Sequence, residues 1–205
     1  MKKQVIVIHG GDTFNAYEKY IEFLKNWQID FEAYRTGKSD WKRGLEEKLG
    51  AGYEVIRPDM PAKLNAKYTE WQIWFEKFIP FFENEAVFVG HSLGGLFLAK
   101  YLSENNLPKK IKAAFLIAAP YDEKDLKGES LADFILSENL NKFQNQCEKI
   151  FIYHSEDDPC VPLAEFEKYK KALPGAVTKT FEKKGHFNQE ELPELILDIK
   201  SLYLT

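Results

Sequence analysis

The sequence predicts an α/β protein with a doubly wound, mostly parallel six-stranded sheet and helices on both faces of the sheet. Short apolar segments alternate with amphipathic segments of helical spacing from one end of the chain to the other. The apolar segments show little polar alternation, which is typical of strands that are covered on both sides. The 205 residues contain no repeat and no linker. We therefore expect one domain over residues 1–205.

Six apolar segments have the length of buried strands. They are residues 4–8, 53–58, 86–89, 111–118, 149–153 and 177–181. With right-handed crossovers, a doubly wound sheet of this kind takes the strand order 2-1-3-4-5-6. The first and third strands are then neighbours at the point where the order reverses. The loops that follow these two strands should flank one crevice.

Apolar residues at helical spacing predict a helix in most of the intervals between strands. The predicted helices are residues 15–27, 69–82, 94–104, 131–143, 163–173 and 191–202. Thr69 has the position and chemistry of an N-cap for the second of them. Residues 30–52 depart from the alternation, because the segment is long for a connection and rich in charged and aromatic residues. We predict an extra surface element there.

Charge and the N-terminal segment restrict the partners and the compartment. The formal net charge is −4, from 28 basic and 32 acidic side chains without a long block of one sign. This gives no reason to expect nucleic acid or a membrane as partner. The first apolar run, residues 5–8, is shorter than the about 7–15 residues of a signal peptide or the about 20 of a membrane span. We expect a cytoplasmic protein whose Cys147 and Cys160 are free thiols.

A serine between glycines follows the third predicted strand. Residues 90–94, GHSLG, match the pattern G-x-S-x-G where a strand ends and a helix begins. Such a turn strains the backbone at the serine and exposes its hydroxyl beside the N–H groups of a helix N-terminus. Ser92 is the predicted nucleophile, and the N–H of Leu93 is a predicted donor to an oxyanion. The alternative is a glycine-rich turn that only packs the helix against the sheet.

A serine hydroxyl needs a base to take its proton, and the base needs an acid to orient it. The chain order in this arrangement is serine, acid, histidine, which leaves His154 and His186 as bases. His186 is the predicted base because it follows the sixth strand in a short loop. The loop after the fifth strand supplies the acid. Asp158 is favoured because Pro159 holds the residue before it extended, and Asp157 is the alternative.

The loop after the first strand completes the predicted site. Residues 9–12, HGGD, end at the same crevice as Ser92, so Gly11 is the predicted second oxyanion donor. Cys160 is two residues from Asp158, and packing is its predicted role. The histidines and cysteines have no metal-ligand spacing, so the prediction includes no metal and no cofactor.

These segments resemble the α/β-hydrolase superfamily and, more narrowly, the small serine hydrolases of the retinoblastoma-binding protein 9 type. The matching segments are HGGD at 9–12, VGHSLGG at 89–95, SEDDPCVP at 155–162 and GHFN at 185–188. The resemblance implies Ser92 as nucleophile, Asp158 as acid and His186 as base. It also implies a compact sheet without a large lid. The segment 30–52 is longer than the family pattern.

The prediction is therefore a serine hydrolase that cleaves small-molecule ester substrates, with amides and thioesters as further candidates, through an acyl-enzyme on Ser92. The alternative is a non-catalytic protein-binding module on a hydrolase scaffold, which would have a protein partner in place of a substrate. The complete set of serine, acid and histidine favours the enzyme, because a binding module has no need of all three.

Overall fold

The computed structural model describes residues 2–37, 40–126 and 130–204. It contains a six-stranded sheet in which every neighbouring pair of strands is parallel, in the order β2-β1-β3-β4-β5-β6. The strands are β1 (Lys3–Ile8), β2 (Tyr53–Ile56), β3 (Ala86–His91), β4 (Ile111–Ile117), β5 (Cys147–Ser155) and β6 (Val177–Phe181). The predicted fold class and strand order are confirmed.

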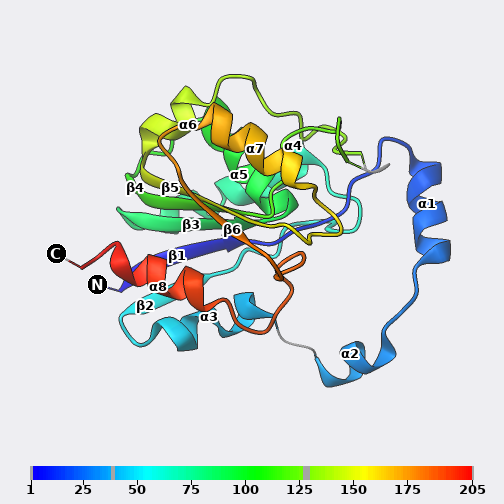
Figure 1. The fold of residues 1–205 in the computed structure, drawn as a ribbon, viewed down its shortest axis with the longest axis horizontal. Coiled ribbons are helices and arrows are strands. Elements are labelled where there is room, and N and C mark those ends of the chain that lie inside the picture. The colour runs from blue at the N-terminus through cyan, green and yellow to red at the C-terminus, as the bar shows by residue number, and fades with distance from the viewer. Residues whose placement is uncertain (1, 38–39, 127–129, 205) are drawn as a thin grey trace.

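Helices cover both faces of the sheet (Figure 1). They are α1 (Tyr17–Asn26), α2 (Phe31–Thr36), α3 (Trp41–Leu49), α4 (Tyr68–Glu76), α5 (Leu93–Glu104), α6 (Asn141–Gln146), α7 (Leu163–Ala172) and α8 (Pro193–Ser201), with a 3₁₀ turn η1 (Ile79–Phe81). Figure 1 shows α3 and α8 below the sheet, α4 to α7 above it, and α1 and α2 away from it. Within the described ranges, none of these helices has the length and apolar character needed to cross a bilayer.

The strands are apolar on both faces because each face has its own hydrophobic cluster. On β1, Ile6 and Ile8 pack into the cluster under α4 and α5, whereas Val5 and Val7 pack into the cluster under α3 and α8. Full burial of one such side chain stabilises the fold by about 1.5–3 kcal/mol. The two clusters fix the strand ends in space, and the loops that carry the polar residues start from those ends.

The helix predicted at residues 131–143 is wrong. In the described residues of this segment, a helix begins only at Asn141. Ala132 has a left-handed backbone, with φ 48°. The Ser137 hydroxyl accepts the Asn139 N–H at 3.3 Å, and the Asn139 side chain accepts the Asn141 N–H at 2.8 Å. Side chains of this kind compete with helical hydrogen bonds and favour turns.

The predicted cap and length of the helix at residues 69–82 also need correction. The helix begins one residue earlier than predicted and ends at Glu76, and Thr69 is not its cap. The Tyr68 N–H donates instead to both carboxylate oxygens of Asp133, at 3.0 Å each. A carboxylate at this place offsets the partial positive charge of the helix N-terminus.

The segment 30–52 contains two different structures. Helix α2 is exposed, and its Phe31 and Tyr34 side chains are 69% and 77% accessible to solvent. Helix α3 is instead part of a covering layer, because Trp41, Leu45 and Leu49 are buried in the cluster beneath the sheet. The extra surface element is therefore confined to the first part of the segment, and the second part belongs to the core.

Candidate active site

Ser92 occupies the sharp turn between β3 and α5. Its backbone angles are φ 55° and ψ −126°, a conformation that costs a non-glycine residue of order 1–3 kcal/mol. The Ser92 N–H donates to the carbonyl oxygen of Ile117 on β4 at 2.8 Å, and this bond holds the turn to the sheet. The structure therefore has the strained strand–turn–helix geometry that presents a serine at the carboxyl end of a sheet.

Glycines allow three segments to meet at this turn. A Cβ atom added at Gly94 would lie 2.4 Å from the carbonyl oxygen of Ile8 and 2.5 Å from that of His9. One added at Gly10 would lie 2.9 Å from the Cβ of Ser92. Because no side chain can be accommodated at these distances, the glycines bring the loop after β1 directly against the serine.

We expect Gly94→Ala to destabilise the protein by about 3 kcal/mol or more, because the clash is with backbone atoms of β1 and its loop. The matched control is Gly44→Ala in the middle of α3, where an added Cβ meets nothing within 4 Å. That change should stabilise the protein by about 1 kcal/mol through helix propensity. Urea unfolding measures both, and equal effects would contradict the packing described here.

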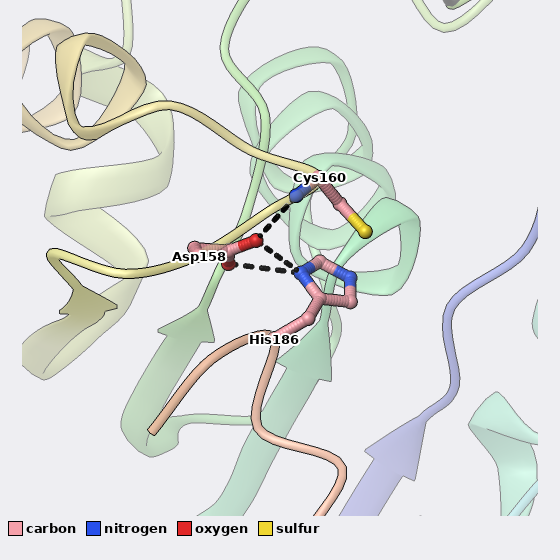
Figure 2. A group of neighbouring side chains, drawn as sticks. All are labelled: Asp158, Cys160 and His186. Atoms are coloured by element: carbon pink, nitrogen blue, oxygen red, sulfur yellow. Dashed lines mark hydrogen bonds and ion pairs between the residues drawn. The ribbon is translucent and has the colours of Figure 1, made fainter. Parts of the chain in front are cut away.

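His186 and Asp158 form a hydrogen-bonded pair (Figure 2). The Nδ1–H of His186 donates to the carboxylate of Asp158, at 2.9 and 3.0 Å to its two oxygens. One of these oxygens also accepts the N–H groups of Cys160 and Val161, at 2.8 and 3.0 Å. The Asp158 side chain is only 1% exposed, and that of His186 is 13% exposed. The carboxylate is thus fixed by its own loop and orients the imidazole ring.

Asp157, the alternative acid, has a different set of partners. Its Oδ1 accepts the Ser155 hydroxyl at 2.6 Å and the Gly185 N–H at 2.8 Å. These hydrogen bonds hold the pKa of Asp157 below its usual value. Asp157 therefore ties the loop of His186 to the end of β5, while Asp158 contacts the imidazole itself.

The backbone of the His186 loop has two further anchors that the sequence did not suggest. The His91 Nε2–H donates to the carbonyl oxygen of His186 at 2.8 Å, and the Trp41 Nε1–H donates to that of Phe187, also at 2.8 Å. Gly185 and Phe187, on either side of His186, have left-handed backbones with φ 50° and 52°. His91 and Trp41 are positioning residues, because they contact the loop and hold it in this conformation.

The loops meet around one cavity of about 760 Å³, which is lined by four of the predicted site residues: Gly11, Ser92, Leu93 and His186. Asp158 lies behind His186. In the part of the chain that the structure describes, the Ser92 hydroxyl makes no hydrogen bond to the His186 ring, and the N–H groups of Gly11 and Leu93 donate to no protein acceptor. These two N–H groups therefore remain available for a ligand.

A family comparison agrees with this geometry. The model of a serine hydrolase family matches residues 33–192, more than half of the chain. The protein is a member of this serine hydrolase family. The match includes the segments of Ser92, Asp158 and His186. The comparison with curated proteins gives no match.

Solved structures show the same fold as this hydrolase. The ydeN gene product of B. subtilis superposes with a TM-score of 0.70 at 19% identity, over 98% of this chain and 99% of that one. A lipase-esterase related protein from Clostridium acetobutylicum superposes with a TM-score of 0.62 at 10% identity, over 98% of this chain and 94% of that one. Est1E from Butyrivibrio proteoclasticus superposes with a TM-score of 0.62 at 17% identity, over 98% of this chain and 86% of that one. At these identities the likeness establishes the α/β-hydrolase fold.

The cavity of the hydrolase has both aromatic and charged walls. Phe14 and Phe23 line it, the latter from α1, so this outlying helix forms one side of the site. Burial raises the pKa of Asp12, and the charge of His186 acts in the opposite direction. Burial lowers the pKa of Lys42, whose ammonium pairs with Asp40 at 2.8 Å. A bound molecule would meet apolar surface together with a few charged groups.

The other three histidines of the hydrolase have structural roles. The Nε2 of His9 accepts the Met60 N–H at 2.9 Å, and the Nε2–H of His154 donates to the carbonyl oxygen of Val161 at 2.9 Å. His91 holds the loop of His186, as described above. Burial is the main cause that lowers the pKa of all three imidazoles. Each is therefore held neutral in the folded state near neutral pH.

These lowered pKa values predict acid sensitivity. The unfolded chain takes up protons as the pH falls below about 6.5, whereas the folded chain resists protonation of these histidines, so stability is lost as the pH decreases. Each histidine contributes up to about 1.4 kcal/mol per pH unit to this loss. Urea unfolding at pH 7, 6 and 5 measures the slope. His154→Gln, whose amide can still donate to the carbonyl of Val161, should make the unfolding free energy less dependent on pH, by up to the contribution of one histidine. An unchanged pH dependence would contradict the role of His154 in the acid sensitivity.

Proposed function

We propose that this hydrolase is a carboxylesterase-like enzyme that cleaves small esters through an acyl-enzyme on Ser92. The observation that carries the proposal is the hydrogen-bonded Asp158–His186 pair at the cavity that Ser92 also lines. A strained serine, an oriented imidazole and unpaired N–H groups are the parts that acyl transfer requires. The resemblance to hydrolases of the retinoblastoma-binding protein 9 type implies hydrolysis of small ester or amide substrates, which agrees with this proposal.

In the proposed reaction the Ser92 oxygen attacks the carbonyl carbon of the ester, and the Nε2 of His186 accepts the hydroxyl proton. Asp158 keeps the proton of the imidazole on Nδ1 and stabilises the imidazolium that forms. The N–H groups of Gly11 and Leu93 donate to the oxyanion. His186 then gives its proton to the leaving alcohol, which leaves the acyl group on Ser92.

Water completes the cycle. His186, neutral again, takes a proton from a water molecule that attacks the acyl carbon, and Ser92 is released with its proton restored. The side chain of His186 is 13% exposed, so a water molecule that enters the cavity can reach the ring. In this reaction the hydrogen bond between the Ser92 hydroxyl and the Nε2 of His186 forms when the substrate binds, because such bonds are often long or poorly aligned before that step.

The cavity supports small acyl groups as substrates. The cavity has a volume of about 760 Å³, and Phe14 and Phe23 form part of its wall. This aromatic surface suits a short apolar acyl chain. We expect highest kcat/KM on short esters of a p-nitrophenyl series from acetate to laurate. Thioesters and aminoacyl amides of matched acyl groups belong in the same panel. Absence of turnover with every member would overturn the proposal, and capture of a protein partner without turnover would favour the binding module.

A further inference from the structure

Three potential metal ligands of this protein lie together beside the cavity. One ligand atom each from Asp158, Cys160 and His186 lies within 4.8 Å of the other two. The first two residues are on the loop after β5, and His186 is on the loop after β6 (Figure 2). The spacing of cysteines and histidines in the sequence gave no indication of a metal site, because the fold brings these loops together.

The three side chains occupy defined positions. Figure 2 shows Asp158 on the side of the His186 ring that carries Nδ1, and the sulfur of Cys160 on the side of the second nitrogen. The Cys160 N–H donates to Asp158 at 2.8 Å, which fixes the backbone that carries the thiol. The Cys160 side chain is exposed and lines the same cavity as Ser92, so an ion can reach it from solvent.

The chemistry of these groups suits zinc. A cysteine thiolate and an imidazole nitrogen are common zinc ligands, and in a tetrahedral site they lie about 3.5 Å apart. Histidines that bind zinc generally donate their other N–H to a carboxylate, which orients the ring and increases its basicity as a ligand. Asp158 already makes this hydrogen bond to Nδ1. The sulfur of Cys160 lies on the side of the second ring nitrogen, where one ion would contact both Sγ and Nε2.

We propose that Zn²⁺ binds to the Sγ of Cys160 and the Nε2 of His186, supported by Asp158, and that it inhibits the hydrolase reversibly. On binding, the thiol releases its proton to solvent, an S–Zn bond and an N–Zn bond form, and all waters of the hydrated ion except two leave. Waters retain the two other positions of the tetrahedron. The inhibition rests on the proposed function, because the lone pair of His186 that binds the metal is the one that would accept the proton of Ser92.

Cobalt absorption tests the site without any turnover. Co²⁺ bound to a thiolate gives a sulfur-to-metal charge-transfer band, and we expect this band in the wild type, with loss of the band when Zn²⁺ is added. Cys160→Ser should remove it. Cys147→Ala is the matched control and should keep it, because burial raises the pKa of the Cys147 thiol to about 12 and makes that thiol a poor ligand. A band that persists in Cys160→Ser, or no band in the wild type, would overturn the proposal.

Calorimetry and inhibition complete the test. The Zn²⁺ affinity measured by titration calorimetry should fall at least about tenfold in Cys160→Ser and in His186→Gln, but not in Cys147→Ala. Zn²⁺ should inhibit ester turnover by the wild type, and a chelator should restore the rate. Equal inhibition of Cys160→Ser would contradict the site. Zinc binding by a protein without esterase activity would overturn the proposed function alone, so the two failures are distinguishable.

Discussion

Replacing Ser92 by alanine should lower kcat for a p-nitrophenyl ester by about 10⁴- to 10⁶-fold. The reason is that acyl transfer loses its nucleophile, while the cavity and the N–H groups of Gly11 and Leu93 remain. The residual rate would come from substrate binding and oxyanion stabilisation. The fold should be retained, because the Ser92 side chain makes no hydrogen bond that alanine would remove in the described part of the chain.

Ser103→Ala is the matched control for this experiment. Ser103 lies near the end of α5, the helix that begins after Ser92, and its hydroxyl donates to the carbonyl oxygen of Ala99 at 2.7 Å. Its removal should leave kcat unchanged, as measured with the same ester. Retention of more than about a tenth of the activity by Ser92→Ala would contradict the account, because the loss expected for a nucleophile is far larger.

Asp158→Asn should lower kcat about 10⁴-fold. Asparagine has nearly the same shape, but its amide cannot stabilise the imidazolium, and its NH₂ group favours the wrong tautomer of His186. Asp157→Asn should lower kcat less than about tenfold, because Asp157 acts on the loop rather than on the ring. Steady-state kinetics of both variants decide between the two aspartates.

A larger loss of kcat in Asp157→Asn than in Asp158→Asn would assign the role of the acid to Asp157. It would contradict the assignment that we base on the Asp158–His186 hydrogen bonds. A measurement of stability separates the two roles further. Asp157→Asn replaces a carboxylate oxygen that accepts two hydrogen bonds, so its free energy of unfolding should decrease at neutral pH. The stability of Asp158→Asn should be measured in the same buffer. Its loss of activity counts as catalytic only where it is larger than the loss that the unfolded fraction of the variant would cause.

The fold of this hydrolase could be predicted because its strands have a local signal. Strands that are buried on both faces appear in the sequence as short continuous apolar runs, such as β1 and β4. Chirality then limits the order of parallel strands to a few possibilities. The G-x-S-x-G turn is also local, because glycines at fixed positions are what the strained backbone of Ser92 demands.

Features that depend on distant partners could not be predicted in this way. The start of α4 is capped by Asp133, far along the chain, so the local signal of Thr69 was misleading. The same holds for Trp41, which lies in a segment interpreted as a surface element and yet holds the loop of His186. Its indole N–H and the carbonyl of Phe187 meet only because α3 packs below the sheet, in the hydrophobic cluster that also contains Phe187.

Cys160 shows how the site itself extends beyond its sequence motif. The chain places the thiol two residues after Asp158, which indicates that the thiol lies near the site. Its position beside the His186 ring follows from the parallel pairing of β5 and β6, which places the loops after both strands at one edge of the sheet. A hydrogen bond from this cysteine's own backbone N–H to Asp158 completes the arrangement.

The most direct test of the account is covalent labelling by a fluorophosphonate, which reacts with a serine only where an adjacent base and oxyanion donors activate it. The wild type should carry one adduct, and peptide mass spectrometry should locate it on Ser92. Asp158→Asn should react far more slowly, and Ser92→Ala should remain unlabelled. An adduct on another residue, or equal labelling of wild type and Ser92→Ala, would contradict the assignment of Ser92 as the nucleophile.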